Sequence, residues 1–539
     1  MLGMPVREEY RRCVPLLFVL PIVYVALIIW LRQTAGSFSH WYSIDPNIRY
    51  LLDALNILAL DPPGNVDHPG ATVQWIGALI LRVFQPFSSV EEITNAALLQ
   101  SDAFLWPILV GLTVLTAAAM VVAGAAALSL EKGLLPAVLI QLAPFLSRIL
   151  VKNSMDVKPV PLLIASVLLT AALIFIALRP GVLERQQKGF IWGFGLIGGF
   201  SVATKITALP ILVLPIFLFW GWRSLFQYGL ACAVGFIVFA FPTLFQFDVF
   251  AQWIFKVAMG SGAYGGGELS VVDFSAYPGS LYKLLSRPIT FVPIILALIA
   301  FVLAHLQKQK ITDYPRLELR ALMGVTLAQF AQIALVAKHP SAHYIVSALA
   351  LSGLSIGLVY LVFRRLAFGG DVFRRRAFGG FVFLILVLMI SRVPSSFKIY
   401  HEMADKNEQA LELNDSQFDQ CLKIYGLFAS NQSFAMIYGN LLVQETFSDR
   451  LTKILPNNEI AYLAYRGEAR QASGVVNLSD LTENYTCFYG RVSNEHGGAG
   501  GVKAVIERSV PGTELSSSCS NKYEAVFTAG VECQGRLLD

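Results

Sequence analysis

Charged residues are scarce in this chain of 539 residues, because Asp, Glu, Lys and Arg together make up only 14% of it. Soluble globular domains carry about 25% charged residues, so this composition excludes an ordinary soluble protein. The sequence also lacks three motifs: Cys and His at zinc-ligand spacing, a phosphate-binding P-loop and a Ser/His/Asp motif. Their absence argues against a zinc enzyme, a nucleotide hydrolase and a serine hydrolase.

Long apolar runs are what the chain has instead, since 55% of its residues are hydrophobic. Short loops with Arg and Lys separate these runs, and each run can cross a hydrocarbon core of about 30 Å as a helix. We therefore predict a polytopic α-helical membrane protein. Its eleven expected spans are residues 14–31, 102–129, 134–150, 160–178, 190–204, 206–221, 228–245, 289–305, 319–337, 343–363 and 377–393.

The basic loops predict the orientation of these spans. Residues 71–83 are too short to cross a bilayer and are expected to form an interfacial helix. With eleven spans and a cytoplasmic N-terminus, the Arg- and Lys-rich loops lie inside, as the positive-inside rule requires. The net charge of +5 thus indicates orientation and gives no sign of a nucleic-acid partner. On the extracytoplasmic side we expect the outer loops 32–101 and 246–288 and all residues after 394.

The composition changes near residue 394, so we predict two domains. Residues 1–394 form the membrane module, and residues 395–539 form an extracytoplasmic α/β domain, with helix-like runs at 405–423 and 440–455 and alternating, strand-like runs at 460–465 and 503–507. Four of the six cysteines, Cys421, Cys487, Cys519 and Cys533, fall in this domain. An oxidising compartment would pair them into two disulfides, with three pairings open.

The first outer loop holds the most polar segment near the N-terminus. Asp45-Pro46 is typical of a helix start, and the leucines that follow give an apolar face at helical spacing. We expect a helix on the membrane surface. Asp53 is expected to be solvated and to point away from Asp45, because it is displaced around the helix by roughly 80°.

Isolated cations at the ends of apolar runs are the second unusual feature. Lys205 interrupts about thirty apolar residues, and an ionisable group in such a run is a functional candidate by default. The plainer interpretation is a lysine that snorkels at a helix end. Other cations of this kind are Lys152, Lys158, Lys338, His339 and His343.

Several short motifs together resemble one family. They are Asp45 at the start of an interfacial helix, Asp67-His68-Pro69-Gly70 at the start of a second, Ser154-Met155-Asp156 after the third span, residues 198–207 around Lys205, and Lys338-His339 with His343-Tyr344. Their order and sidedness resemble the GT-C superfamily of membrane glycosyltransferases, of the protein-mannosyltransferase and aminoarabinose-transferase type. The resemblance covers residues 1–394. It implies an inverting transferase that moves a sugar from a polyprenyl-phosphate donor to a protein, lipid or glycan acceptor.

The resemblance also implies roles for individual residues. Asp45 is the candidate general base, and Asp156 would orient the acceptor. Candidates for holding the leaving phosphate and the rest of the substrate are Lys205, Lys338, His339 and His343, then Arg49 and Lys158, with Asp67, His68 and Tyr344 beside them. The family's Asp-Glu pair is here Asp45-Pro46, which puts a second carboxylate in doubt. No cofactor is implied, although Asp45 and Asp156 offer oxygen ligands for Mg²⁺ or Mn²⁺ as an alternative.

Two other functions stay open at the level of sequence. A transporter or flippase of a lipid-linked sugar would also need membrane spans and charged groups, but we see no repeat between two halves of the chain. A non-catalytic subunit of a membrane assembly would need the outer domain only and would leave the outer carboxylates dispensable.

Overall fold

The computed structural model describes residues 14–67, 70–130, 134–260, 266, 270, 272–309, 314–366, 379–380, 387, 391, 393–463, 465–496, 499–509, 515–517 and 519–532. The chain forms two compact units. The first consists of Met1–Ile29, Val66–Val73 and Val110–Phe397, and the second of Trp30–Asn65, Gln74–Leu109 and Lys398–Asp539. We predicted loop 32–101 as part of the membrane module, whereas most of it folds with the C-terminal residues.

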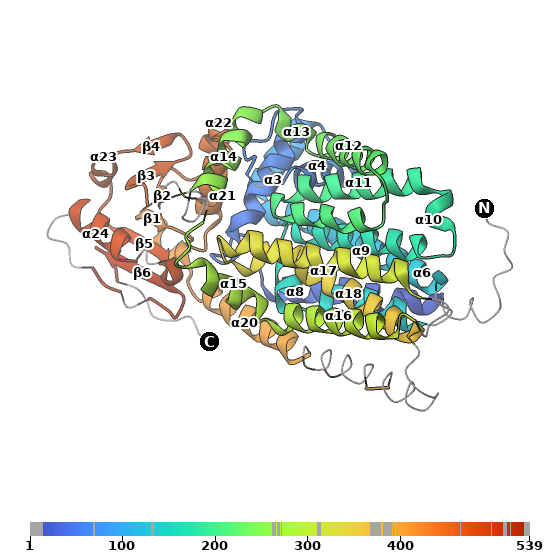
Figure 1. Cartoon of the computed structure of the whole chain (residues 1–539). Helices are drawn as coiled ribbons and strands as arrows, with labels where there is room; N and C mark the ends of the chain where they lie inside the picture. Colours follow the sequence, from blue (N-terminus) through green and yellow to red (C-terminus); the bar gives the residue numbers. More distant parts are fainter. Residues whose placement is uncertain are drawn as a thin grey trace. The chain divides into compact units, whose positions relative to one another are not determined.

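Helices make up the first unit in its described part (Figure 1). Its elements are η1 (Pro15–Phe18), α2 (Val19–Thr34), α6 (Ser101–Leu130), α7 (Leu134–Gln141), η2 (Ala143–Phe145), α8 (Arg148–Ser154), α9 (Val160–Ala177), α10 (Val182–Arg185), α11 (Gln187–Thr204), η3 (Ile206–Phe217), α12 (Trp222–Phe239), α13 (Phe241–Leu244), α14 (Phe247–Met259), α15 (Tyr277–Leu285), α16 (Pro288–Gln307), α17 (Arg316–Ala337), η5 (Ala342–Tyr344) and α18 (Val346–Arg365). The ends of α2 and α6 and most of α4 (Ala71–Phe84) belong to the second unit.

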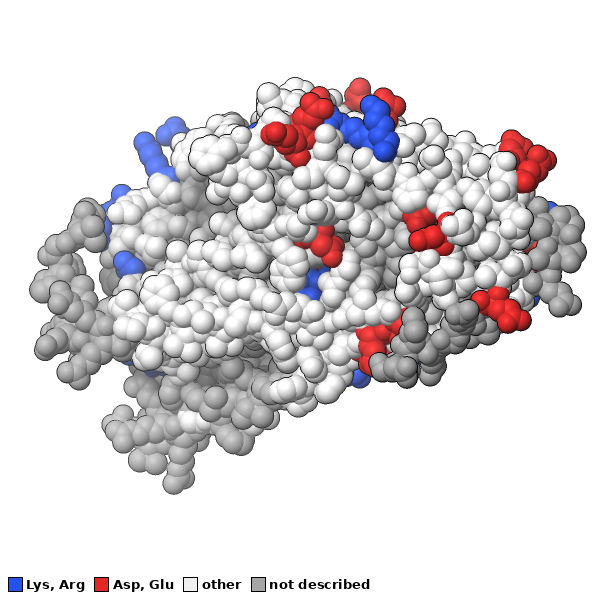
Figure 2. Space-filling view, turned by 180° about the vertical axis from the view of Figure 1, so that it is seen from behind, with Lys and Arg blue, Asp and Glu red and all other residues white. Residues whose placement is uncertain are grey.

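Seven helices in the described residues are long and apolar enough to cross a membrane. They are Pro15–Thr34, Ser101–Leu130, Val160–Ala177, Trp222–Phe239, Pro288–Gln307, Arg316–Ala337 and Val346–Arg365. The protein is therefore a polytopic α-helical membrane protein, as predicted, and broad areas of the face in Figure 2 carry no charged residue among those described.

The count of eleven spans is not confirmed. The expected span 134–150 is broken into α7, η2 and the start of α8, with Pro144 in the break. The expected span 206–221 is the 3₁₀ helix η3, which contains Pro210 and Pro215. Proline removes a backbone donor and clashes with the preceding turn, so these apolar runs do not continue as regular α-helices. The expected span 377–393 lies largely outside the described residues.

Helix α18 is the centre of the first unit. Almost the whole of it is buried, and α9, α16 and α17 pack against it (Figure 1). At its last turn, Arg365 forms an ion pair with Glu318 at the start of α17, with 2.9 Å between Nη2 and Oε1. Glu318 is itself buried, so this pair fixes one end of both helices.

The second unit contains a six-stranded sheet with helices. Its elements are α3 (Ile44–Leu58), α5 (Val90–Leu99), α20 (Val393–Leu411), η6 (Asp415–Phe418), β1 (Leu422–Gly426), α21 (Gln432–Leu442), α22 (Ser448–Ile454), β2 (Glu459–Leu463), β3 (Glu468–Gln471), β4 (Gly474–Val476), α23 (Leu478–Thr482), β5 (Phe488–Ser493), η7 (Asn494–His496), α24 (Ala499–Ser509) and β6 (Glu524–Ala529). The strand order is β4-β3-β2-β1-β5-β6, with β1 parallel to both β2 and β5 and the remaining pairs antiparallel. The predicted C-terminal α/β domain is thus present.

Two local predictions in this unit are wrong, and the expected helical run 440–455 is broken between the end of α21 and the start of α22. Residues 503–507 lie in helix α24 instead of a strand, because Val502 and Ile506, four residues apart, are both buried against the sheet. The expected helix 405–423 ends at Leu411 in α20, and its last residues begin β1, whose residues are all buried. In both places packing against the sheet overrides the local pattern.

Two of the four cysteines form a disulfide between the residues that directly precede two neighbouring strands. Cys421 precedes β1, Cys487 precedes β5, and their Cα atoms lie 4.8 Å apart. Cys519 is also disulfide-bonded, and Cys533 lies outside the described residues. The structure therefore decides one pairing that the sequence left open.

Candidate functional site

Lys205 occupies the turn between two helical segments of the first unit. Its backbone is extended, with φ −161° and ψ 125°, so α11 ends before it and the tighter helix η3 begins after it. The side chain is only 7% exposed. Its Nζ atom lies 4.5 Å from the centre of the Tyr344 ring, in a cation–π arrangement. A snorkelling lysine would extend to solvent, whereas this one is held inside the fold.

His343 lies beside the same ring. Its imidazole centroid is 4.2 Å from that of Tyr344, and its Nδ1 atom is 2.8 Å from the Ser341 hydroxyl. Burial, followed by the positive charges of Lys205 and Lys158, lowers the pKa of His343 to about 3. The imidazole is therefore neutral at pH 7 and offers hydrogen bonds in place of the charge that its position in the sequence suggested.

Asp156 and Lys158 come from the short segment between α8 and α9. Lys158 Nζ lies 2.8 Å from an Asp156 carboxylate oxygen, and the Asp156 side chain is nearly buried. Helix α8, which leads into this segment, contacts η5, so the charge of Lys158 acts on His343. We call Asp156, Lys158, Lys205, His343 and Tyr344 the cation cluster; all five residues were predicted as site residues.

Two hydrogen-bonding residues that the sequence analysis missed hold this cluster together. Gln332, in α17, donates from its Nε2 atom to the backbone carbonyls of Thr207 (3.0 Å) and Tyr344 (3.1 Å), and so joins η3 to η5. The Thr72 hydroxyl, at the start of α4, donates to the Thr204 hydroxyl at 2.8 Å. A buried Gln within an apolar helix was the available signal for Gln332.

Lys338 and His339 follow α17 directly. The Lys338 ammonium donates to the backbone carbonyls of Val257 (3.0 Å) and Ala258 (2.6 Å) in α14. Burial, with the Lys338 charge next, lowers the pKa of His339. Lys338 thus ties the end of α17 to α14 and is bound differently from Lys205.

Asp45 and Arg49 lie in the second unit. Asp45 has non-helical backbone angles (φ −98°, ψ 126°), so the regular turns of α3 begin at Pro46. An Arg49 Nη2 atom lies 3.7 Å from the Asp45 carboxylate, whose side chain is 37% exposed. Asp45 is therefore accessible to solvent, with a cation beside it.

Asp53 differs from our expectation of a solvated carboxylate. It is completely buried; its Oδ1 atom accepts from the backbone N–H groups of Gly64 (2.7 Å) and Asn65 (3.3 Å), and its Oδ2 atom from Gln74 Nε2 (2.9 Å). Burial raises the pKa of Asp53 to about 7. The reason is that α3 does not lie alone on a surface: α21 packs on it where Gly439 meets Ile48. Asp53 therefore holds the loop after α3.

The remaining predicted residues can be placed only in part. Asp67 lies in the segment before α4, in the first unit, and His68 is outside the described residues. In the part of the chain that the structure describes, no three Asp, Glu, His or Cys residues gather into a metal-binding group. Asp156 and Asp45 each have a cationic partner, so we derive no step through Mg²⁺ or Mn²⁺.

Two solved structures are similar to this chain. One is ArnT from Cupriavidus metallidurans in the apo state, with a TM-score of 0.48 and 12% identity over 95% of this chain and 97% of that one. The other is the same protein bound to undecaprenyl phosphate, with a TM-score of 0.45 and 13% identity over 95% and 98%. No protein-family model and no curated protein matches the sequence. Because these likenesses are distant, we base the function on the side chains of this protein.

Proposed function

We propose that this membrane protein is an inverting glycosyltransferase that moves a sugar from a polyprenyl-phosphate donor to an acceptor hydroxyl on the extracytoplasmic side. The observation that supports it best is the cation cluster, in which Lys158, Lys205 and His343 lie together at the ends of apolar helices. A lipid phosphate needs both an apolar surface for its chain and buried donors for its charge.

Transfer requires one bond to break and one to form. The acceptor oxygen attacks the anomeric carbon, the bond from that carbon to the phosphate oxygen breaks, and the lipid phosphate leaves with the electron pair. Lys205 and Lys158 would stabilise the growing charge on the phosphate, and neutral His343 would donate a hydrogen bond. The acceptor proton would go to Asp45, the general base in this proposal.

Asp156 would have a supporting role. Its ion pair with Lys158 would fix the position of that ammonium group, while Lys205 lies against the Tyr344 ring. Gln332 would act indirectly, by holding η3 and η5 at a fixed position relative to each other through its two hydrogen bonds. We therefore expect Gln332 to be a positioning residue.

The side of the membrane is part of the proposal. The disulfide Cys421–Cys487 supports an oxidising compartment for the second unit, since cytosolic disulfides are rare. A tag placed after Asp539 should be accessible to a membrane-impermeant reagent in intact cells. Accessibility only after permeabilisation would move the second unit to the cytoplasm and overturn the orientation.

The central experiment uses the purified full chain in lipid nanodiscs. Undecaprenyl phosphate tests donor-site binding, and a labelled polyprenyl-phosphate sugar with a crude acceptor extract tests transfer. Binding together with label transfer supports the proposal. Binding without transfer favours the transporter or the non-catalytic subunit, and the absence of both overturns the assignment.

A further inference from the structure

A pocket of about 460 Å³ lies within the second unit, away from every residue assigned a role above. Its volume falls in the range of small-molecule sites. Three segments line it: the turn after α2, the junction between α5 and α6, and the start of α21. The polar residues that matter for its chemistry are Ser39, His40, Ser101, Asp102, Ser430 and Asn431.

The pocket adjoins a place in the sheet where ligands commonly bind. Strand β1 lies between its two parallel neighbours β2 and β5, and Ser430 and Asn431 belong to the loop that leaves the carboxyl end of β1. The connection after β1 leads to β2 on one side and the connection after β5 leads to β6 on the other, an arrangement that opens a crevice outside the carboxyl ends of β1 and β5. Here the loop between β1 and α21 forms one wall of the pocket.

Two hydroxyl groups in the pocket lack a protein partner. Ser39 is 7% exposed and Ser101 2% exposed, and neither side-chain oxygen has a hydrogen bond to any described residue. Each hydroxyl can therefore donate one hydrogen bond and accept others from whatever fills the cavity. The wall of one cavity thus carries two hydroxyl groups that a ligand could bind.

Three neighbouring groups have bonding capacity left over. Asp102 accepts one bond, from the Phe38 N–H at 3.1 Å, through Oδ1 only. The Ser430 oxygen accepts from the Trp41 N–H at 3.0 Å, and the Asn431 carbonyl oxygen accepts from the Phe434 N–H at 2.9 Å. Within the described residues, the second Asp102 oxygen, the Ser430 hydroxyl proton and the Asn431 amide protons remain for a ligand.

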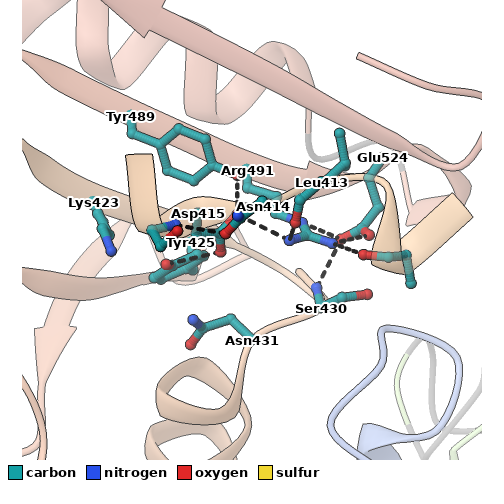
Figure 3. Close-up of polar contacts among 12 residues, drawn as sticks. Leu413, Asn414, Asp415, Lys423, Tyr425, Ser430, Asn431, Tyr489, Arg491 and Glu524 are labelled. Carbon is teal, nitrogen blue, oxygen red and sulfur yellow. Dashed lines mark hydrogen bonds and ion pairs between the residues drawn. The ribbon is translucent and has the colours of Figure 1, made fainter. Parts of the chain in front are cut away.

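A buried network of hydrogen bonds and ion pairs supports the Ser430 side of the pocket (Figure 3). The Ser430 N–H donates to Glu524 at 2.7 Å, and Arg491 donates to the other Glu524 oxygen at 2.6 Å and to Asp415 at 3.0 Å. Arg491 and Glu524 are both completely buried in the second unit. This network fixes the loop before ligand binding, which lowers the entropic cost of recognition.

The charge of the lining distinguishes between ligand classes. Its residues include one carboxylate, Asp102, and no Lys or Arg. Burial, followed by the charges of Arg491 and Arg32, lowers the pKa of His40 to about 4, so that the imidazole is neutral at pH 7. A phosphate would meet a carboxylate without a compensating cation. A ligand with many hydroxyls matches this mixture of donors and acceptors, because each hydroxyl both donates and accepts.

We propose that this pocket binds one or two neutral sugar residues through their hydroxyl groups. Within the proposed function it is the site for a carbohydrate part of the acceptor, and this second statement rests on that function. The anionic donor belongs to the cation cluster, so the two chemistries are assigned to different residues.

The experiment measures binding of free sugars to the full chain in nanodiscs. Glucose, galactose, mannose, N-acetylglucosamine and their common disaccharides are titrated one by one and followed by saturation-transfer NMR, with inorganic phosphate as the anionic probe. The variants are Ser39→Ala and Ser101→Ala, and the matched control is Ser479→Ala, an exposed serine on α23 of the same unit.

We expect at least one sugar to bind, and each pocket variant to bind it at least about tenfold more weakly, the effect of about 1.4 kcal/mol. Without sugar, both variants should unfold at about the same temperature as the wild type, because neither hydroxyl has a hydrogen bond to a described residue that the substitution would remove. Ser479→Ala should change neither property. A misfolded variant is thereby separated from one that has lost a ligand contact.

Binding of no sugar, binding of phosphate in preference to sugar, or unchanged sugar binding in both pocket variants would overturn the pocket assignment. Sugar binding without any transfer activity would support the assignment of the pocket and contradict the proposed transferase function. Sugar transfer by Ser101→Ala with an unchanged KM for the acceptor would support the transferase function and contradict the role of the pocket in acceptor binding.

Discussion

Lys205 Nζ lies 4.5 Å from the centre of the Tyr344 ring, although the two residues come from different segments of the chain. The contact depends on the break between α11 and η3, which turns Lys205 inward, and on Gln332, which holds the Tyr344 carbonyl. A cation over an aromatic face is stabilised by roughly 0.5–2 kcal/mol. This pair is the part of the cation cluster on which the first prediction rests.

Lys205→Ala should weaken the binding of undecaprenyl phosphate by about 10- to 100-fold, because a charge-assisted hydrogen bond to phosphate is lost. Binding is measured in nanodiscs by isothermal titration calorimetry. Lys188→Ala is the control, since Lys188 is an exposed lysine near the other end of the same helix. Equal binding of undecaprenyl phosphate by the Lys205 variant and the wild type would show that Lys205 does not contribute to the donor site.

His343→Gln should bind the lipid phosphate within about threefold of the wild type at pH 7, because both side chains are neutral hydrogen-bonding groups there. The pKa of His343 is lowered to about 3, below its unfolded value. The stability it contributes is therefore present above about pH 6.5 and is lost as the pH falls towards 3. Thermal unfolding from pH 7 to pH 4 should be less pH-dependent in the variant. A much larger loss of binding at pH 7 would mean that a charged imidazole is needed.

Asp45→Asn should lower turnover by about 10²- to 10⁴-fold and leave donor binding intact, the effect of a lost general base. Transfer of labelled sugar by the purified protein measures it. The appropriate control is Asp61→Asn, since Asp61 is an exposed carboxylate in the loop after α3, whereas Asp53 is buried and structural. Full activity in Asp45→Asn would assign the base to another residue.

Asp53→Asn should destabilise the second unit by about 1–3 kcal/mol near pH 5.5, because its amide group would face the Gln74 donor or one of the two backbone N–H donors. The pKa of Asp53 is raised from 3.8 to about 7. Its contribution to stability is thus present below about pH 4 and lost as the pH rises through 7. The difference between wild type and variant should therefore shrink between pH 5.5 and pH 8 in thermal unfolding. Asp61→Asn should leave the unfolding curve unchanged at every pH.

Non-reducing peptide mapping should recover Cys421 and Cys487 in one linked peptide, and Cys232, a free and buried cysteine of α12, as an alkylated thiol after unfolding. Replacing both linked cysteines by serine should destabilise the second unit by about 2–5 kcal/mol, because the bridge closes a loop with a sequence separation of 66. Cys232→Ser serves as the control. Alkylation of Cys421 in the native protein would contradict the pairing.

Much of the membrane architecture could be predicted, because an apolar run in lipid has few alternatives to a helix. Seven of the expected spans correspond to long apolar helices in the structure. The prediction failed where proline interrupts an apolar run, as in η3, because hydrophobicity alone does not report which backbone hydrogen bonds can form. It also failed at residues 503–507, where two buried side chains on one face of α24 decide the structure.

The sequence by itself determined that this protein has apolar helices, a C-terminal region with strands and helices, and a small set of isolated cations and carboxylates. Only the tertiary structure decided what those side chains do. Asp45 and Asp53 look alike in the sequence, yet one is accessible to solvent and the other is completely buried with three donors around it. The charge of His343 likewise depends on burial and on lysines from two other segments. Desolvation and Coulomb interactions act through space, so residues distant in the chain set the chemistry of each group.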